Sequence, residues 1–459
     1  MSIASEISRI QNNIASAYTA CENKGATLPQ TQNSANLANT ISNIPASSAS
    51  LNPTAEPNDV EFIDYDGTIR YSYSASDFAN LSALPDNPTH EGLIAQGWNW
   101  TLADAKSYVA NYGYIIIGQM YVTDDNKTRI YVKIKEFGKS PYLGFAISGT
   151  AIVDWGDGTT STVTGTGTSV YEIISTQHFY TNVGNYIITI SSENQIYFLG
   201  KSNYGSTILW DNISNQERNR ISQNEIYKIE LGNNIVLGDG AFKDCGSLIS
   251  VTMPQNLTSI GGFLGAYALK GLVVPKSVTS IPSFQNCYSL IRISLPKTTS
   301  SLTSFNSCYS LKNITIPDNI SSLGGFQDCA SLERLVAPAS VTTIQGSCCS
   351  KASSLSVLII KGNVTKLPSN MVTYAYSFAY FVAPSNLTTI ESQAFYYIRN
   401  CKRFDFSKLT IVPTLENTNV FSSTPDDCQI IVPDDLYDTW ISATNWSTYA
   451  SKIVKASEV

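Results

Sequence analysis

The chain has 459 residues and a net charge of −7 at pH 7, with 14% charged, 43% apolar and 11% aromatic residues. This length exceeds one ordinary core and indicates several folded units. No lysine and arginine cluster appears, which excludes a nucleic-acid-binding surface of the usual basic kind. The N-terminus lacks signal-peptide features and no apolar run could span a bilayer. We therefore expect synthesis in the cytoplasm without a signal peptide and no membrane insertion.

Residues 1–45 are predicted to form a helical segment for oligomerisation or docking. Apolar residues recur there at alternating three- and four-residue steps, at Ile3, Ile7, Ile10 and Ile14. Isoleucine at both seam positions favours three strands, and hence a homotrimer. The alternative is a helical hairpin that packs on its own domain. The stretch ISRIQNNIASAYTACENKGATLP resembles N-terminal segments of tail-associated proteins from phages and prophages of Gram-positive gut bacteria. That resemblance implies docking to other virion tail proteins.

After a linker at residues 46–58, residues 59–138 are predicted to form a small α+β domain. VEFIDYDGTIRYSYS predicts a hairpin around Asp66-Gly67, and TLADAKSYVANYG predicts an amphipathic helix. YVTDDNKTRIYVKI predicts a second hairpin. The run LPDNPTHEGLIAQGW resembles the β-grasp repeats of bacterial surface proteins. Asp64, Asp66 and His90 invite a catalytic interpretation, but no nucleophile motif accompanies them, and turn or surface roles are expected.

Residues 139–195 are predicted to form a β-sandwich, followed by a connector at residues 196–223. AIVDWGDGTTSTV reads as strand, tight turn and strand, and HFYTNVGNYIITIS adds an aromatic pair and an alternating strand. These two stretches resemble PKD-type modules, in which Trp155 and Tyr186 would belong to the packing. Asp154 and Asp157 are expected to form the turn, with calcium binding as the alternative.

The strongest signal is a repeat at residues 224–430. Leu-x-x-apolar-x-apolar-Pro recurs at a constant step from one leucine to the next, at Leu248, Leu269, Leu290, Leu311 and Leu332. Later units drift to longer spacings, with Leu355, Phe378 and Phe404 in the leucine position. Each unit predicts a short strand ended by proline, and stacked units share one core, which predicts a parallel solenoid. The unit GAFKDCGSLISVTMPQNLTSIG resembles the BspA-type leucine-rich repeats. Residues 431–459 break the period and are predicted to cap the array.

The cysteines of the repeats share one position with an alanine, at Cys245, Ala266, Cys287, Cys308 and Cys329. A position that accepts either residue indicates a small buried slot, with disulfides or a metal site as the alternative. The cysteines lack C-x-x-C spacing, so no zinc site is predicted. No catalytic residue, metal or other cofactor is predicted.

The residues between the apolar positions of each strand are expected to point outward, aligned about 4.8 Å apart between turns. They form a polar row at Arg292, Ser294, Asn313, Thr315 and Arg334. A second row, suited to sugar stacking or apolar contact, contains Tyr267, Tyr288 and Tyr309. Both rows are candidate ligand-binding surfaces, and simple solvated surface is the alternative for each.

The predicted fold is therefore multidomain and mainly β. It comprises the helical segment, the β-grasp-like domain, the PKD-like sandwich and the leucine-rich-repeat solenoid. The predicted function is that of a non-enzymatic phage tail adhesin in the virion, which recognises a bacterial surface glycan or protein. The alternatives are a bacterial cell-surface adhesin and a tail-associated depolymerase, although no motif proposes the carboxylates that such an enzyme needs.

Overall fold

The chain divides into two compact units, residues 1–54 and 55–459. The computed structural model describes residues 59–136, 138, 140–201, 205, 206, 208 and 222–459, with Ile14, Tyr18, Thr31, Asn33 and Asn36 of the first unit. In that unit, Ile14 is helical and half-buried. The buried Tyr18 donates a hydrogen bond to the carbonyl of Asn33 at 2.8 Å. The other predicted seam residues, Ile3, Ile7 and Ile10, lie outside the described residues.

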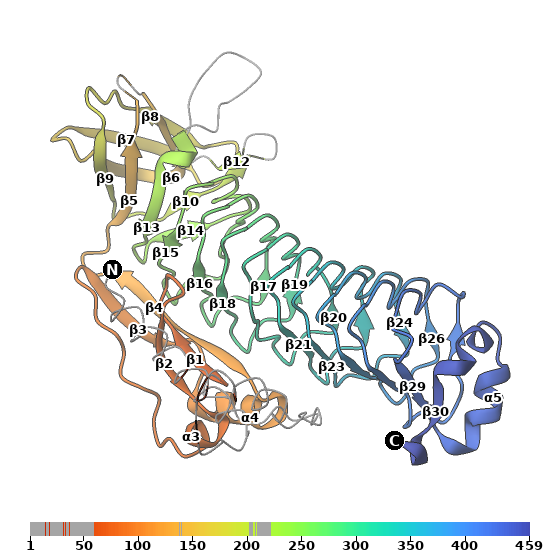
Figure 1. Ribbon diagram of the computed structural model, residues 1–459. Helices are drawn as coiled ribbons and strands as arrows, with labels where there is room; N and C mark the ends of the chain where they lie inside the picture. The colour runs from red at the N-terminus through yellow and green to blue at the C-terminus, as the bar shows by residue number, and fades with distance from the viewer. Residues whose placement is uncertain are drawn as a thin grey trace. The chain divides into compact units, whose positions relative to one another are not determined.

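The second unit begins with a four-stranded sheet of order β2-β1-β4-β3 (Figure 1). Its elements are β1 (Val60–Ile63), β2 (Ile69–Tyr73), α3 (Ala75–Ala79), β3 (Leu93–Trp98), α4 (Leu102–Tyr112) and β4 (Ile115–Thr123). The expected hairpin is confirmed, because β1 and β2 pair antiparallel. The expected helix is confirmed as α4, which the Thr101 hydroxyl caps and which ends at Gly113 in the left-handed conformation. We call this sheet with its two helices the small domain.

The second predicted hairpin of the small domain is wrong. Strand β4 stays in the small domain, whereas β5 (Thr128–Ile134) pairs with β9 and β13 in a nine-stranded sheet. Alternation in the sequence shows that a strand has two faces, but not which sheet it joins. The short connection at Asp124–Lys127 therefore leads from one sheet to the next.

The nine-stranded sheet has the order β14-β10-β6-β9-β5-β13-β15, and β7 and β8 also pair with β6. Its further strands are β6 (Tyr142–Asp154), β7 (Thr160–Gly167), β8 (Ile174–Gln177), β9 (Gly184–Ser191), β10 (Ile196–Phe198), β13 (Ile226–Glu230), β14 (Ile235–Leu237) and β15 (Ser250–Val251). A two-stranded piece, β11 (Gly200–Lys201) and β12 (Gly205–Ser206), lies in the connector. Because β13 and β15 belong to the first repeats, this sheet joins the solenoid without a break.

The expected turn in WGDGT is observed between β6 and β7. The carboxylate of Asp154 accepts from the backbone N–H of Gly156, and that of Asp157 accepts from the backbone N–H of Thr159. Trp155 is fully buried and stacks on His178, whose ring lies 2.7 Å from the Asp157 carboxylate. Both aspartates therefore serve the turn. The likeness of this region to PKD modules stays a prediction.

The solenoid has about ten turns and carries two parallel strand rows (Figure 1). The first row, which we call the strand face, continues from β15 through β16 (Gly271–Val273), β18 (Arg292–Ser294), β21 (Arg334–Ala337), β23 (Val357–Ile360), β25 (Tyr380–Val382), β27 (Arg403–Asp405), β29 (Gln429–Val432) and β30 (Ile453–Lys455). The second row contains β17 (Ser280–Ile281), β19 (Ser301–Leu302), β20 (Ser322–Leu323), β22 (Thr343–Ile344), β24 (Lys366–Leu367), β26 (Thr389–Ile390) and β28 (Thr414–Leu415).

The pairing register confirms the predicted period and its drift. Gly271 pairs with Arg292, which matches the step between the early leucines, whereas the longer step from Arg334 to its partner Val357 matches the later units. One assignment is wrong: Phe404 pairs with Phe381 and so occupies the strand position of its turn. The leucine position of that turn belongs to Cys401. A sequence pattern that requires a large apolar residue at the leucine position does not detect this turn, because a cysteine stands there.

The solenoid core confirms the predicted shared interior. The recurring phenylalanines stack with ring centroids 4.9–5.5 Å apart, at Phe242, Phe263, Phe284, Phe305 and Phe326. The cysteine position is a buried slot, as expected. The Cys287 and Cys308 thiols each donate a 3.2 Å hydrogen bond to a phenylalanine carbonyl of the preceding turn. The described cysteines are free thiols.

The predicted C-terminal cap contains a helix, as expected. Helix α5 (Tyr437–Ser442) is followed by a 3-10 segment at Trp446–Lys452. Trp440 and Trp446 are buried and both lie 5.8 Å from the ring of Phe406. Strand β30 then pairs with β29 and extends the strand face by one turn. The cap thus covers the apolar end that an open repeat would expose.

Candidate functional site

The polar row predicted for ligand binding lies against the small domain. Ser294 and Thr315 are fully buried there, and Arg292, Asn313 and Arg334 are half-buried. The backbone N–H of Ile116 in β4 donates to the Thr315 hydroxyl at 2.8 Å. The Ser294 hydroxyl donates to the carbonyl of Ile116, also at 2.8 Å. The row does point away from the solenoid core, but these two hydroxyl groups already have intramolecular partners.

Charged residues of the polar row also pair with the small domain. The Arg292 guanidinium lies 2.9 Å from the carboxylate of Glu61, whose side chain is only 7% exposed. Arg334 donates to the backbone carbonyl of Tyr112 at 2.8 Å. Burial lowers the pKa of Arg334, although Asp59 nearby opposes this shift. A guanidinium stays protonated at any ordinary pH, so the contact keeps its charge.

Three side chains of the small domain reach the carbonyls beyond the ends of the solenoid strands. The Asn99 amide donates to the carbonyl of Val274 at 2.9 Å, and the Trp100 indole donates to that of Leu295 at 2.8 Å. The buried Tyr108 hydroxyl donates to the carbonyl of Ile316 at 2.7 Å. A buried carbonyl without a partner costs about 1–3 kcal/mol. These bonds therefore fix the small domain on the strand face.

The turn between β1 and β2 makes a second contact with the solenoid. A Cβ built on Gly271 would lie 2.2 Å from the Cα of Gly67, so the two glycine backbones touch. Beside this contact, the fully buried Asp64 carboxylate accepts from Arg70 at 2.7 Å and lies 2.8 Å from a ring nitrogen of His90. Its environment is that of an internal ion cluster.

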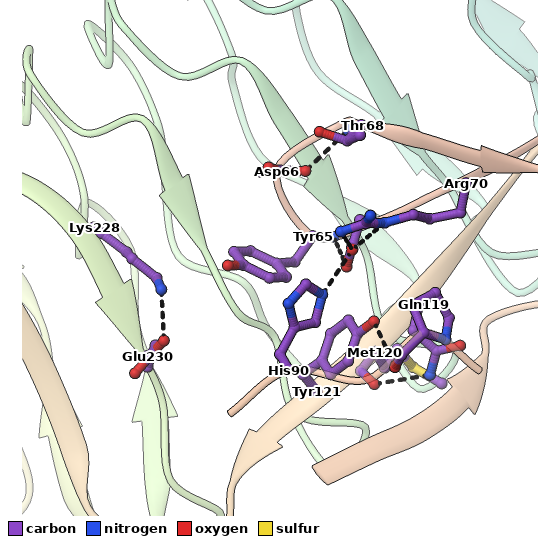
Figure 2. Close-up of polar contacts among 12 residues, drawn as sticks. Tyr65, Asp66, Thr68, Arg70, His90, Gln119, Met120, Tyr121, Lys228 and Glu230 are labelled. Carbon is purple, nitrogen blue, oxygen red and sulfur yellow. Dashed lines mark hydrogen bonds and ion pairs between the residues drawn. The ribbon is translucent and has the colours of Figure 1, made fainter. Parts of the chain in front are cut away.

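Figure 2 shows this cluster beside Tyr65, Tyr121 and the solenoid residues Lys228 and Glu230. The Lys228 ammonium lies 2.7 Å from the Glu230 carboxylate and 5.6 Å from the Tyr65 ring centroid. Burial raises the pKa of Tyr65 and of Tyr121. Neutral phenols and paired charges suit a structural contact. Asp66 is half-buried and accepts from the backbone N–H of Thr68, which is the expected turn role.

The predicted tyrosine row lies at an exposed edge of the solenoid, which we call the tyrosine edge. Tyr267, Tyr288 and Tyr309 are 41%, 38% and 46% exposed, and adjacent rings stack with centroids 5.0 Å apart. The faces of the central ring are covered by its two neighbours. A ligand would therefore meet ring edges and hydroxyl groups. No described residue bonds to these three hydroxyl groups.

The sequence pattern missed one member of this edge. In the following turns the tyrosine position is held by Ala330, then Ser353 and then Tyr376, as the backbone hydrogen bonds between turns show. Tyr376 is 43% exposed and lies near Tyr374, with ring centroids 6.5 Å apart. Applying the longer repeat length of the later units to the tyrosine position would have identified Tyr376 from the sequence.

Neither a metal site nor a membrane span appears in the parts of the chain that the structure describes. No three His, Cys, Asp or Glu side chains gather there as metal ligands would. No described helix combines the length and the apolar character of a membrane-crossing segment.

Three solved structures are similar to this chain at low identity. The first is a leucine-rich repeat protein from Bacteroides ovatus, with 14% identity over 53% of this chain and a TM-score of 0.31. The second is a leucine rich cell surface protein from Faecalibacterium prausnitzii, with 15% identity over 57% of this chain and 94% of that chain, at a TM-score of 0.26. The third is a leucine-rich repeat protein from Eubacterium ventriosum, with 15% identity over 44% of this chain and 84% of that chain, also at 0.26. This chain spans 62% of the length of the Bacteroides ovatus protein.

No curated protein sequence is close enough to this chain to count as a match. A family model does match, described as the BspA type leucine rich repeat region. It matches six copies, over residues 172–290 and 282–402. These residues make up half of the chain, and they contain the regular early units, the stacked phenylalanines and the buried cysteine slot. The chain belongs to the BspA-type leucine-rich-repeat family.

Proposed function

We propose that this chain is a non-enzymatic adhesin that recognises a glycan or protein on a bacterial surface through the tyrosine edge. The observation that carries the proposal is the exposed stack of Tyr267, Tyr288 and Tyr309. Tyrosine offers a large amphipathic contact area and is enriched at the energetically important centres of interfaces. Because each ring is held by its neighbours, little side-chain entropy is lost when a ligand binds.

The polar row enters this proposal in a different role. Four of its residues, Arg292, Ser294, Thr315 and Arg334, bind the small domain, so the part of the strand face that they occupy is closed to a large ligand. Recognition is therefore assigned to the tyrosine edge, and these four residues are assigned to holding the small domain in place. The small domain then acts as a fixed part of the scaffold.

We further propose that the N-terminal segment attaches the protein to a larger assembly as a homotrimer. The setting proposed first is a phage tail, on the likeness of residues 1–45 to tail-associated proteins. The bacterial cell surface is an equally consistent setting for a binding solenoid of this family. The solution mass of the full chain tests the assembly, with an Ile7→Asp/Ile14→Asp variant as comparison. A trimer that becomes a monomer supports the proposal, and an unchanged mass contradicts it.

Binding to intact Gram-positive gut bacteria tests the recognition role. The fluorescently labelled full chain is compared with a Tyr288→Ala/Tyr309→Ala variant in a cell-binding assay. The matched control is Tyr171→Ala, which removes a tyrosine that is 94% exposed on another part of the second unit. We expect at least about 30-fold weaker binding for the double variant and no change for the control, since a central interface tyrosine contributes about 2 kcal/mol or more. Equal binding by all three proteins would contradict the assignment.

A further inference from the structure

A cleft of about 390 Å³ lies between the small domain and the solenoid, away from the tyrosine edge. The small domain contributes Trp98, Trp100 and Asp104 to its lining, and the solenoid contributes Lys276, Lys297 and Asn319. The three solenoid residues come from consecutive turns and each lies within two residues after a proline, Pro275, Pro296 or Pro317. The volume falls within the range of about 300–1,000 Å³ that is typical of small-ligand pockets.

One wall of the cleft is apolar and rigid. The indole N–H of Trp98 donates to the carbonyl of Pro85 at 2.9 Å, and that of Trp100 donates to the carbonyl of Leu295 at 2.8 Å. Both indoles are more than nine-tenths buried. The indole nitrogens already have partners, so the small part of each ring that reaches the cleft offers carbon atoms and no free N–H. Pro296 adds to this wall. Such a surface suits the C–H face of a sugar ring.

The opposite side of the cleft is polar and carries two lysines. The Lys297 ammonium donates to the Asp104 carboxylate at 2.5 Å and so links the two walls. This hydrogen bond, with a second one from Thr101, holds the pKa of Asp104 below its usual value. The pair is therefore ionised and contributes no net charge at neutral pH. No group among the described residues pairs with the exposed Lys276 ammonium, whereas Lys297 also interacts with the negative charge of Asp318 on the next turn.

A hydrogen-bond acceptor completes the polar side. The Asn319 amide nitrogen donates to the carbonyl of Lys297 at 2.7 Å, which orients its oxygen without using it. The Thr298 hydroxyl donates to carbonyls of the preceding turn, and its oxygen can still accept. A ligand with both hydroxyl groups and an anion would find a partner for each.

We propose that this cleft binds a sugar unit that carries a carboxylate, that is, a uronic acid residue of an acidic saccharide. The sugar ring packs on the wall of Trp98 and Trp100, the carboxylate pairs with Lys276, and a ring hydroxyl donates to Asn319. The site is distinct from the tyrosine edge and does not depend on the proposed recognition role of the tyrosines.

Isothermal titration of the full chain with digalacturonate tests the site, at about 50 mM salt so that the charge pairing is not strongly screened. The neutral disaccharide 4-galactobiose is the ligand control. The variants are Lys276→Gln and Asn319→Ala, with Lys361→Gln as the matched control because it removes an exposed lysine from another turn. Both test residues are exposed, and equal unfolding midpoints would verify that each variant folds.

We expect digalacturonate to bind the native chain at least tenfold more tightly than 4-galactobiose. The Lys276→Gln change should weaken binding about tenfold, since a charge-assisted hydrogen bond is roughly twice as strong as a neutral one. Asn319→Ala should weaken binding severalfold, whereas Lys361→Gln and Tyr288→Ala should leave it unchanged. The proposal is overturned if digalacturonate does not bind, if the neutral sugar binds equally well, or if Lys276→Gln has no effect.

Discussion

The contact between Gly67 and Gly271 gives the sharpest test of how the small domain is held. Other turns of the solenoid carry serine, arginine and asparagine in the row of Gly271, so the solenoid itself does not require glycine there. In a Gly271→Ala variant, the new Cβ would lie 2.2 Å from the Cα of Gly67, and an ordinary contact is 3.4 Å or more. The obstacle is backbone, which cannot rotate aside as a side chain can, so the two backbones would have to separate.

The size of the effect follows from the bonds that hold the small domain on the following turns. Separating the backbones would stretch the 2.8 Å bond of Trp100 and the 2.7 Å bond of Tyr108 towards breaking. Overpacking costs about 1–3 kcal/mol, and each weakened hydrogen bond adds about 0.5–1.5 kcal/mol. We therefore expect the small domain to be bound about 2–6 kcal/mol less tightly in the Gly271→Ala variant.

Hydrogen exchange at Ile116 reports this loss directly, because its backbone N–H donates to the Thr315 hydroxyl of the solenoid. A loss of about 2 kcal/mol would speed its exchange about 30-fold. The control is Gly346→Ala, where the nearest atom to the new Cβ would be 3.7 Å away. We expect that control to be neutral or slightly stabilising. If Ile116 exchanged equally slowly in both variants, the proposed role of the glycine contact would be refuted.

Three further predictions concern the solenoid slot and the β6–β7 turn. Cys287→Ala should lower the free energy of unfolding by about 1 kcal/mol, measured in urea, and Cys287→Val should lower it by about 1–3 kcal/mol because the slot is small. Burial raises the pKa of Cys245 and Cys287 to about 12, so neither thiol should react with a disulfide reagent at pH 8 until the chain is unfolded; rapid reaction of the native protein would contradict this. Burial acts to raise the pKa of Asp157, but hydrogen bonds from Thr159 and His178 outweigh it and lower that pKa. Its carboxylate therefore stabilises the fold above about pH 4 and ceases to do so as the pH falls through the folded-state pKa. Asp157→Asn should accordingly be less stable than the native chain in urea at pH 7, with a difference that shrinks in acid.

The repeats could be predicted closely because each position is set by contacts within one turn and its neighbours. The phenylalanine stack, the cysteine slot and the strand positions each recur at a fixed step, so one unit explains the next. The prediction failed where this regularity changed. Cys401 replaced the expected apolar residue, and the step from Ser353 to Tyr376 is longer than the step between the early tyrosines. Both changes alter the pattern in the sequence while leaving the stacking of turns intact.

The sequence pattern could not predict the contacts between the small domain and the solenoid. Arg292, Ser294 and Thr315 were correctly expected to point away from the solenoid core. An outward side chain can face water, a ligand or a second domain, and alternation is the same in all three cases. A clue was present in Gly271, which interrupts a row of larger residues on the strand face. Its meaning depends on Gly67, far earlier in the chain, and only the structure brings the two together.

The position of the small domain changes what the solenoid can recognise. Repeat proteins offer an extended surface to a ligand, and here the early turns of the strand face hold Glu61, Trp100 and Tyr108 of the same chain. A large ligand must therefore approach the tyrosine edge or the later turns. The same docking also builds a cleft that neither part would have alone, because Asp104 and Lys297 come from different parts of the chain. Loss of the small domain should thus abolish uronate binding while leaving the stacked tyrosines in place. The two proposed sites can therefore be distinguished by this one change.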